Sequence, residues 1–95
     1  MTKKLLALTV GEQLPVGDWI SITQADIDMF AKATNDHQWI HVDPQRCEKE
    51  SPFHTTIAHG YLTVTLMPNS LYQSIEPDPI YQSLLNYGVD KIRFI

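Results

Sequence analysis

The clearest periodic pattern of apolar residues lies between positions 24 and 33. The residues that recur there at helical spacing are Ile27, Phe30, Ala31 and Thr34. Just before them, Thr23 is followed three residues later by Asp26, which resembles a capping box. The pattern predicts a helix from about Gln24 to Ala33. The helix should stop at Thr34-Asn35-Asp36, because these side chains compete for backbone hydrogen bonds and favour turns.

A second, polar helix is predicted shortly afterwards. Asp43 followed by Pro44 has the form of an N-cap residue and a proline at the first helical position. The helix should run from roughly Gln45 to Glu50, and Ser51-Pro52 should close it.

The stretch from Thr55 to Leu71 is apolar on almost every side. Its apolar members include Ile57, Ala58, Tyr61, Leu62, Val64, Leu66 and Met67. This distribution is typical of an element that is buried all round. The β-branched run Thr63-Val64-Thr65 would also suit a strand, and periodicity alone does not decide between the two. Pro68 should end or kink a helix at this point.

Two further segments favour extended structure. Between residues 10 and 22, turn residues alternate with β-formers, which indicates a short strand or an extended segment. The segment from Asn86 to Ile95 is predicted to be a strand, with Ile92 and Phe94 on one face and charged residues on the other. No turn or cap follows it, so we expect the sequence to stop inside an element.

The length and composition predict one small globular domain over residues 1–95. The chain has 95 residues, of which 43% are hydrophobic and 19% charged, and no shift of composition divides it. A chain this short buries a smaller fraction of its surface than a typical domain. We therefore expect it to associate with another copy, as a homodimer or a higher homo-oligomer.

The charge and the apolar runs exclude several classes of partner. A net charge of −4 and a pI near 5.4 do not favour nucleic acid, which needs a basic face. The apolar run after Lys3-Lys4 is too short to span a bilayer and lacks a small-residue cleavage site. The single Cys47 cannot form an internal disulfide and is expected to be a packed apolar residue. These features predict a cytoplasmic protein with no membrane partner.

The densest group of polar and ionisable side chains lies in the connection between the two predicted helices, from Asn35 to Asp43. Such connections often carry catalytic residues. Asp36 and His41, five positions apart on a segment expected to be non-helical, can converge on one water molecule and move its proton. Alternatively, Asp36 caps a turn and His41 is a hydrogen-bonded, half-buried histidine. Spacing alone leaves both interpretations open.

Three strings of residues together resemble a known family. They are Phe30-Ala31-Lys32-Ala33-Thr34-Asn35-Asp36-His37-Gln38-Trp39-Ile40-His41-Val42-Asp43, then Thr56-Ile57-Ala58-His59-Gly60-Tyr61-Leu62, and Asn86-Tyr87-Gly88 with Lys91-Ile92-Arg93-Phe94. They resemble the MaoC-like, (R)-specific enoyl-CoA hydratase branch of the hot-dog fold. The resemblance covers about residues 14–95.

This resemblance implies an α+β hot-dog fold, in which a long central helix is wrapped by a curved antiparallel sheet. The apolar stretch 55–71 would then be the central helix. Members of the family continue past the Arg93-Phe94 strand through further strands, so the fold of these 95 residues is expected to be incomplete at the C-terminus. Active sites in this family lie at a dimer interface.

The resemblance also implies an enzyme of fatty acid metabolism, a hydro-lyase that converts trans-2-enoyl-CoA to (R)-3-hydroxyacyl-CoA or catalyses the reverse dehydration. Asp36 and His41 would hold the hydrating water, and the backbone N–H of Gly60 would bind the thioester oxygen. Which of Asp36 and His41 acts as base stays open. No cofactor is implied, because the coenzyme A thioester is the substrate.

A wider set of residues is expected to bind the substrate: His59, Tyr61, Leu71, Tyr72, Ile75 and Arg93. Packing is the alternative role for the apolar members. His59 is either a second acid or base or a histidine packed at the helix start. The negative charges of coenzyme A need a basic patch, for which Lys91, Arg93, Lys49 and Arg46 are candidates, although each also fits an ordinary solvated charge.

Two other functions fit the same fold. The first is a non-catalytic acyl-thioester-binding or structural hot-dog module, and the second is a hot-dog thioesterase, because one fold hosts many chemistries. The Asp36 and His41 spacing argues against the thioesterase. The four histidines show no regular ligand spacing such as H-E-x-x-H, so no metal site is predicted.

Overall fold

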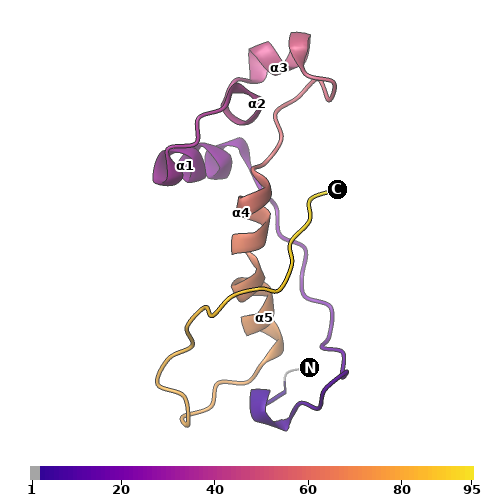
Figure 1. Ribbon diagram of the computed structural model, residues 1–95, viewed down its shortest axis with the longest axis vertical. Helices are drawn as coiled ribbons and strands as arrows, with labels where there is room; N and C mark the ends of the chain where they lie inside the picture. Colours follow the sequence, from indigo (N-terminus) through magenta and orange to yellow (C-terminus); the bar gives the residue numbers. More distant parts are fainter. Residues whose placement is uncertain (1–2) are drawn as a thin grey trace. The chain divides into compact units, whose positions relative to one another are not determined.

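The structure is a computed structural model that describes residues 3–95, and its helices are labelled in Figure 1. The chain divides into two compact units. One unit is the continuous segment Trp19–Met67. The other combines the N-terminal segment up to Asp18 with Pro68–Ile95. The residues expected to carry out catalysis all belong to the first unit.

Helix α1, Gln24–Thr34, confirms the first predicted helix, including its capping box. The Thr23 hydroxyl accepts a hydrogen bond from the Asp26 backbone N–H at 3.2 Å. The Asp26 carboxylate in turn accepts one from the Thr23 backbone N–H at 2.9 Å. This N–H lowers the pKa of the Asp26 carboxyl. The charged carboxylate therefore satisfies a donor that the helix start would otherwise leave unpaired.

The hydrogen bonds at the end of α1 fix the position of the Asp36 backbone. Asn35 adopts the left-handed conformation (φ 59°, ψ 29°), which asparagine tolerates better than most residues. The Ala31 carbonyl accepts hydrogen bonds from the backbone N–H groups of both Asn35 and Asp36, the latter at 3.1 Å. The bond from Asp36 is the 6→1 bond found in Schellman caps, and the bond from Asn35 is the 5→1 bond of the αL motif. Asp36 therefore directly follows the cap residue of α1.

Two short helices follow Asp36, and only the second was predicted. Helix α2, Trp39–Val42, is a single turn, too short to show a helical period in the sequence. The segment between Asp36 and His41 is therefore not wholly irregular, contrary to the prediction. Helix α3, Pro44–Glu50, confirms the predicted polar helix, and the Asp43 carboxylate accepts a hydrogen bond from the Arg46 backbone N–H at 3.1 Å.

The core of this unit is small and partly polar. Its buried apolar residues are Ile27, Ala31, Cys47 and Leu62. Cys47 is completely buried, as predicted for a packed apolar residue. Three polar side chains are buried with them, Ser51, His41 and His59. Buried polar groups normally have hydrogen-bond partners, so this core also dictates which backbone groups the two histidines contact.

The apolar stretch that the sequence left undecided is helical but interrupted. Helix α4, Gly60–Thr65, is separated from helix α5, Met67–Ser74, at Leu66. The Leu66 N–H makes a tight-turn bond to the Thr63 carbonyl at 3.2 Å. Pro68 explains the break, because its ring carries no N–H and would collide with the carbonyl four residues earlier in a continuous helix. The single long helix expected from the family resemblance is thus wrong for these residues.

The second unit contains most of α5 and a short 3₁₀ turn, η1, Leu5–Ala7. Lys3 and Ile75 form an isolated parallel bridge, in which the Lys3 N–H donates to the Ser74 carbonyl at 3.1 Å. Near the other end of the N-terminal segment, the Asp18 N–H donates to the Gln73 side chain at 3.1 Å. The N-terminal segment is therefore attached to the C-terminal half of α5 by hydrogen bonds.

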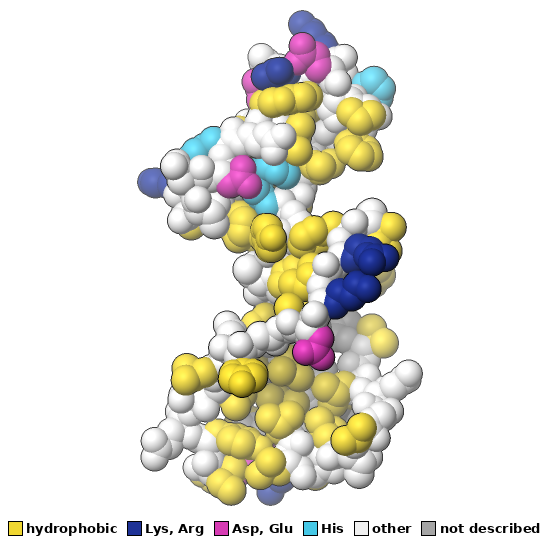
Figure 2. All heavy atoms as spheres, viewed as in Figure 1, with side chains coloured by type: hydrophobic (Ala, Val, Ile, Leu, Met, Phe, Trp, Pro, Cys, Tyr) yellow, Lys and Arg dark blue, Asp and Glu magenta, His cyan; other side chains and the backbone are white. Residues whose placement is uncertain are grey.

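Within residues 3–95 this bridge is the only β-pairing, so the expected sheet and the strand over Asn86–Ile95 are not formed. An extended segment becomes a stable strand only when a partner satisfies its backbone groups. The expected burial of 55–71 on every side is also wrong, since Tyr61 is 68% exposed and Met67 52% exposed. Figure 2 shows many apolar side chains on the surface. No helix in the described chain is long and apolar enough to cross a membrane.

The capping box predicts that removing a threonine hydroxyl lowers the free energy of unfolding more at the start of α1 than at its end. Thr23→Ala removes the N-cap acceptor and should lower the free energy of unfolding by about 1 kcal/mol. Thr34→Ala is the matched control, because the Thr34 hydroxyl only donates back to the Phe30 carbonyl, a bond that adds little to a helix. Urea unfolding followed by circular dichroism would compare them. Equal losses would contradict the assigned role of Thr23.

Candidate active site

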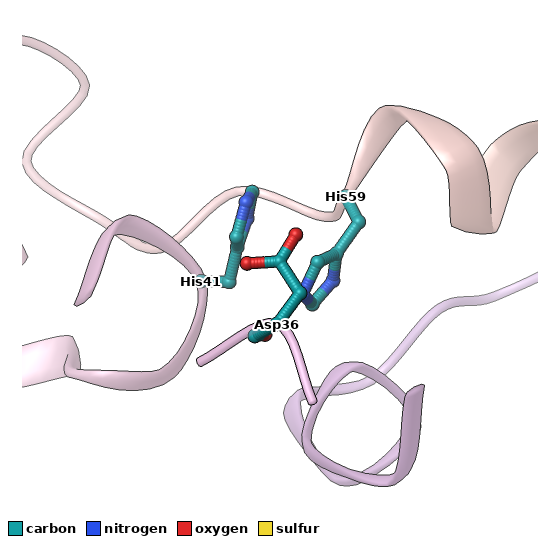
Figure 3. A group of neighbouring side chains, drawn as sticks. All are labelled: Asp36, His41 and His59. Carbon is teal, nitrogen blue, oxygen red and sulfur yellow. The ribbon is translucent and has the colours of Figure 1, made fainter. Parts of the chain in front are cut away.

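Asp36, His41 and His59 converge on one place in the unit Trp19–Met67 (Figure 3). One carboxylate oxygen and one ring nitrogen from each histidine all lie within 4.8 Å of one another. Asp36 comes from the connection between α1 and α2, His41 from α2, and His59 from the residue that precedes α4. The two histidines are buried and Asp36 is exposed. The cluster therefore joins a solvent-facing carboxylate to two rings in the core.

The His41 ring is oriented by the backbone of Ile57. Its Nδ1 lies 2.8 Å from the Ile57 carbonyl oxygen, and the Ile57 N–H donates to the Ile40 carbonyl at 3.0 Å. A carbonyl oxygen can only accept, so Nδ1 is the donor in this bond. In the neutral ring Nε2 then carries the lone pair. His41 is therefore prepared to accept a proton at Nε2.

Gln24, at the start of α1, forms hydrogen bonds with His41 and with Thr56, the residue before Ile57. Its side-chain Nε2 donates to the His41 carbonyl at 2.8 Å. Its Oε1 accepts a hydrogen bond from the Thr56 hydroxyl. Sequence analysis missed this residue, because a glutamine in the first turn of a helix gives no signal of a contact 32 residues away. Gln24 is a structural support of the site.

His59 contacts both other members of the cluster. Its Nε2 lies 3.0 Å from the Asp36 carbonyl oxygen, to which it donates. Its ring stacks on His41 with centroids 3.8 Å apart and planes inclined by 22°, and Phe30 of α1 lies against it at 4.9 Å. His59 Nδ1 is buried and makes no hydrogen bond. The sequence proposed either a second acid or base or a packed histidine, and the structure shows a packed ring that is also hydrogen-bonded.

The spacing of the cluster suits one water molecule. A water that donates to two acceptors at about 2.8 Å each bridges groups roughly 4–5 Å apart. The atoms of this cluster lie within 4.8 Å of one another, which allows such a bridge. Such a water would give one proton to an imidazole nitrogen and be oriented by the carboxylate. The arrangement therefore fits general acid–base chemistry on water.

The same three residues have the composition of a metal site, because two histidines and a carboxylate suit several transition metals. The ring geometry does not favour that use. A metal ion lies close to the plane of each imidazole that binds it, about 2.0–2.1 Å from the nitrogen for zinc. The His41 and His59 rings are stacked with their centres 3.8 Å apart, so their planes are nearly parallel. No point within bonding distance of a nitrogen in each ring lies in both planes. One ring would have to leave the stack for both to bind one ion.

The other predicted site residues are divided between the two units. Gly60 is the first residue of α4, and Tyr61 beside it is exposed. The remaining residues, Leu71, Tyr72, Ile75 and Arg93, belong to the other unit. That unit contains a pocket lined by Tyr72 and Ile75 together with Glu76–Asp78 and residues 81–84. Leu71 is not among the residues that line it, and Arg93 is exposed.

One of the basic candidates for coenzyme A is already engaged within the chain. Arg46 pairs with Glu50, one turn further along α3, and its guanidinium lies 4.2 Å from the centre of the Trp39 ring. A cation over an aromatic face is attracted by the ring electrons. Both contacts would compete with a phosphate, so Arg46 is the weaker candidate. His37 and His54 are both exposed.

Comparison with known proteins identifies the family. The MaoC like domain matches residues 6–95, so the chain belongs to the family of MaoC-like dehydratase domains, which have the hot-dog fold. The chain is 46% identical over 89 residues to "3-hydroxyacyl-thioester dehydratase Z" of Mycobacterium tuberculosis, covering 94% of this chain and 58% of that protein. This confirms the family inferred from the sequence strings.

Two other relatives match the same region. "Nodulation protein N" of Rhizobium leguminosarum is 44% identical over 86 residues, which is 90% of this chain and 53% of that protein. "Protein MaoC" of Klebsiella aerogenes is 30% identical over 89 residues, covering 88% of this chain and 25% of that protein. The chain thus spans about half the length of the mycobacterial and rhizobial proteins.

The hydrogen bonds predict opposite tautomers for the two stacked histidines. In their neutral forms, His41 should carry its proton on Nδ1 and His59 on Nε2, because each of these nitrogens faces a carbonyl oxygen. Long-range nitrogen–proton correlation NMR of the isotopically labelled protein, at a pH where both rings are neutral, distinguishes the tautomers. The same tautomer in both rings would contradict this geometry.

Proposed function

We propose that this protein hydrates trans-2-enoyl-CoA to (R)-3-hydroxyacyl-CoA, or catalyses the reverse dehydration. The supporting observation is the convergence of Asp36 and His41 within reach of one water, in a chain of the MaoC-like family. The name of the mycobacterial relative, a 3-hydroxyacyl-thioester dehydratase, describes the reverse direction of the same chemistry.

In the proposed mechanism the water donates one hydrogen bond to the Asp36 carboxylate and the other to Nε2 of His41. As the water oxygen forms a bond to C3 of the enoyl group, its proton passes to Nε2 of His41. The electrons of the C2–C3 double bond move toward the thioester carbonyl and give an enolate-like oxygen. The imidazolium of His41 then returns the proton to C2, so the neutral site is regenerated and the atoms balance.

The negative charge that develops on the thioester oxygen needs a donor, for which we propose the backbone N–H of Gly60. Gly60 is the first residue of α4, where a backbone N–H has no partner within its own helix. The absence of a side chain allows a close approach of the thioester. A donor placed where charge develops is typically worth a hundredfold or more, on the order of 3 kcal/mol of transition-state stabilisation.

The proposed enzyme needs no cofactor, because the coenzyme A thioester is itself the substrate. We propose His59 and Tyr61 as substrate-binding residues of the unit Trp19–Met67, and Leu71, Tyr72 and Ile75 as substrate-binding residues of the other unit. Tyr72 and Ile75 are supported by the pocket that they line. Arg93 is the proposed contact for the phosphates of coenzyme A, supported by its exposed position. The proposed location is the cytoplasm, with neither nucleic acid nor membrane as partner.

We further propose a single hot-dog domain whose sheet forms in a homodimer or larger homo-oligomer. The support is the exposed apolar surface: Tyr61, Met67 and Ile80 are each more than half exposed. Leaving such side chains in water forgoes about 1.5–3 kcal/mol for each one that could be fully buried. Strands that cover α4 and α5 would recover part of that free energy.

The proposed mechanism predicts that Asp36→Asn and His41→Ala each lower hydration of crotonyl-CoA by at least about a hundredfold. Each substitution removes one of the two groups that act on the same water. The double variant should be scarcely slower than either single variant, because groups that act as a unit are not additive. The measurement is kcat in the full-length protein, followed by loss of the enoyl absorbance.

His37→Ala provides the matched control for these variants. His37 lies in the same connection but is exposed and outside the cluster, so its removal should leave kcat unchanged. An Asp36→Asn or His41→Ala variant that keeps the wild-type kcat, with an unchanged circular dichroism spectrum, would refute the assigned pair.

The mechanism also predicts the stereochemistry of the product. His41 both accepts the proton from water and returns it to C2, so the hydroxyl and the proton reach the same face of the substrate. Addition should therefore be syn, and the family resemblance assigns the product as (R). Chiral chromatography of the 3-hydroxyacyl product, together with NMR of the C2 position after reaction in heavy water, would measure both. A predominantly (S) product would be incompatible with the proposed function.

A further inference from the structure

We infer that His59 is a positioning residue, which holds the Asp36 carboxylate, the His41 ring and the Gly60 N–H in one fixed arrangement. This inference rests on the proposed function and adds a role that differs from acid–base catalysis and from substrate binding. It is based on three contacts of one buried residue, two made by its ring and one by its backbone carbonyl, each directed at a different part of the proposed site.

The first contact fixes the backbone of Asp36. The Asp36 N–H already donates to the Ala31 carbonyl at 3.1 Å, and the Asp36 carbonyl accepts from His59 Nε2 at 3.0 Å. Both backbone polar groups of this residue are therefore bonded, one to α1 and the other to the residue before α4. The Asp36 carboxylate also accepts a hydrogen bond from the Gln38 backbone N–H at 3.4 Å, so the exposed side chain extends from a fixed backbone and has a partner within its own turn.

The second contact sets the plane of the His41 ring. The rings of His41 and His59 stack at 3.8 Å with planes 22° apart, and Phe30 supports His59 at 4.9 Å. The Ile57 carbonyl fixes His41 at Nδ1 but leaves rotation about that bond. The stacked ring of His59 limits this rotation, because close packing leaves no space beside it. His41 Nε2 is therefore directed by His59 as well as by Ile57.

The third contact links His59 to the proposed thioester donor. His59 is the N-cap residue of α4, and its carbonyl accepts hydrogen bonds from the N–H groups of Leu62 and Thr63 at 3.0 and 3.4 Å. Gly60 is its immediate neighbour and the first helical residue. A displacement of His59 would therefore move the Gly60 N–H as well as release Asp36 and His41.

His59 itself is poorly placed to carry a proton. Its Nε2 is bonded to the Asp36 carbonyl, and its Nδ1 is buried and makes no hydrogen bond. The residue is only 3% exposed, and its ring contacts the rings of both Phe30 and His41. A general acid or base must reach the proton that it transfers. These contacts make His59 a positioning residue and not a second acid or base.

Two amide substitutions separate the positioning bond from simple packing. His59→Gln places an amide nitrogen near the position of Nε2, so it can still donate to the Asp36 carbonyl. His59→Asn carries the same amide on a shorter side chain, which reaches only the position of Nδ1. We expect His59→Asn to lower kcat for crotonyl-CoA by about a hundredfold, as a misplacement of about 1 Å can do. His59→Gln should retain kcat within about tenfold of wild type.

KM should change by less than about threefold in both variants, because the loss concerns the transition state and not the binding of the ground state. The wild-type protein is measured in parallel. A wild type that hydrates crotonyl-CoA, with a large loss in His59→Asn and rescue in His59→Gln, is the expected result. A fully active His59→Asn, or equal losses in the two variants, would overturn the inference and leave the proposed function intact.

Loss of the folded state in both variants, judged by circular dichroism and thermal melting, would also overturn the inference, because His59 would then be a packing residue. A folded wild type that hydrates no enoyl thioester would refute the proposed function, and the positioning role with it. The wild-type measurement therefore distinguishes the two failures.

Discussion

Three hydrogen bonds between residues 36–41 and residues 57–59 hold the candidate site together. The Asp36 carbonyl accepts from His59, the Ile40 carbonyl from the Ile57 N–H, and the Ile57 carbonyl from His41. Polar groups buried in a core are costly unless they are paired, by about 1–3 kcal/mol for each one left unsatisfied. The two buried histidines therefore stabilise this unit only when they lie where these carbonyl groups are. These bonds bring Asp36, His41 and His59 together, while His59 Nδ1 stays buried without a hydrogen bond.

The site combines rigid and accessible parts. The backbone of Asp36 is fixed by the cap of α1 and by His59, whereas its carboxylate faces solvent. The His41 ring is buried and oriented at Nδ1, which leaves Nε2 for chemistry. A water molecule between them would meet one exposed acceptor and one fixed acceptor. Catalytic groups that are held in place before the substrate arrives lose little freedom in the transition state.

Local signals in the sequence were sufficient to predict α1 and α3. The capping box at Thr23 and the Asp43-Pro44 pair place the side chains that satisfy helix ends within three residues of their partners. The one-turn helix α2 has no period to detect, and the contact of Gln24 with Thr56 leaves no trace in the sequence. The expected strand near the C-terminus depends on partner strands, and none is formed among residues 3–95.

The proximity of Asp36 and His41 followed from the family resemblance, because a spacing of five residues fits a capped turn equally well. The role of His59 could not be predicted. Its position before Gly60 suggested either an acid–base role or a packing role. The bond from His59 to the Asp36 carbonyl, which indicates a positioning role, is visible only in the structure. Contacts made across 23 residues depend on the path of the backbone, which local patterns do not specify.

We propose that Asp36 and His41 direct water to C3 of an enoyl thioester. The most direct measurement is the reaction of crotonyl-CoA with the full-length protein in water labelled with heavy oxygen, followed by mass spectrometry of the products. We predict that the label appears in the C3 hydroxyl of an intact 3-hydroxybutyryl thioester. Label in the carboxylate of a released acid, together with free coenzyme A, would show thioester hydrolysis and contradict the claim.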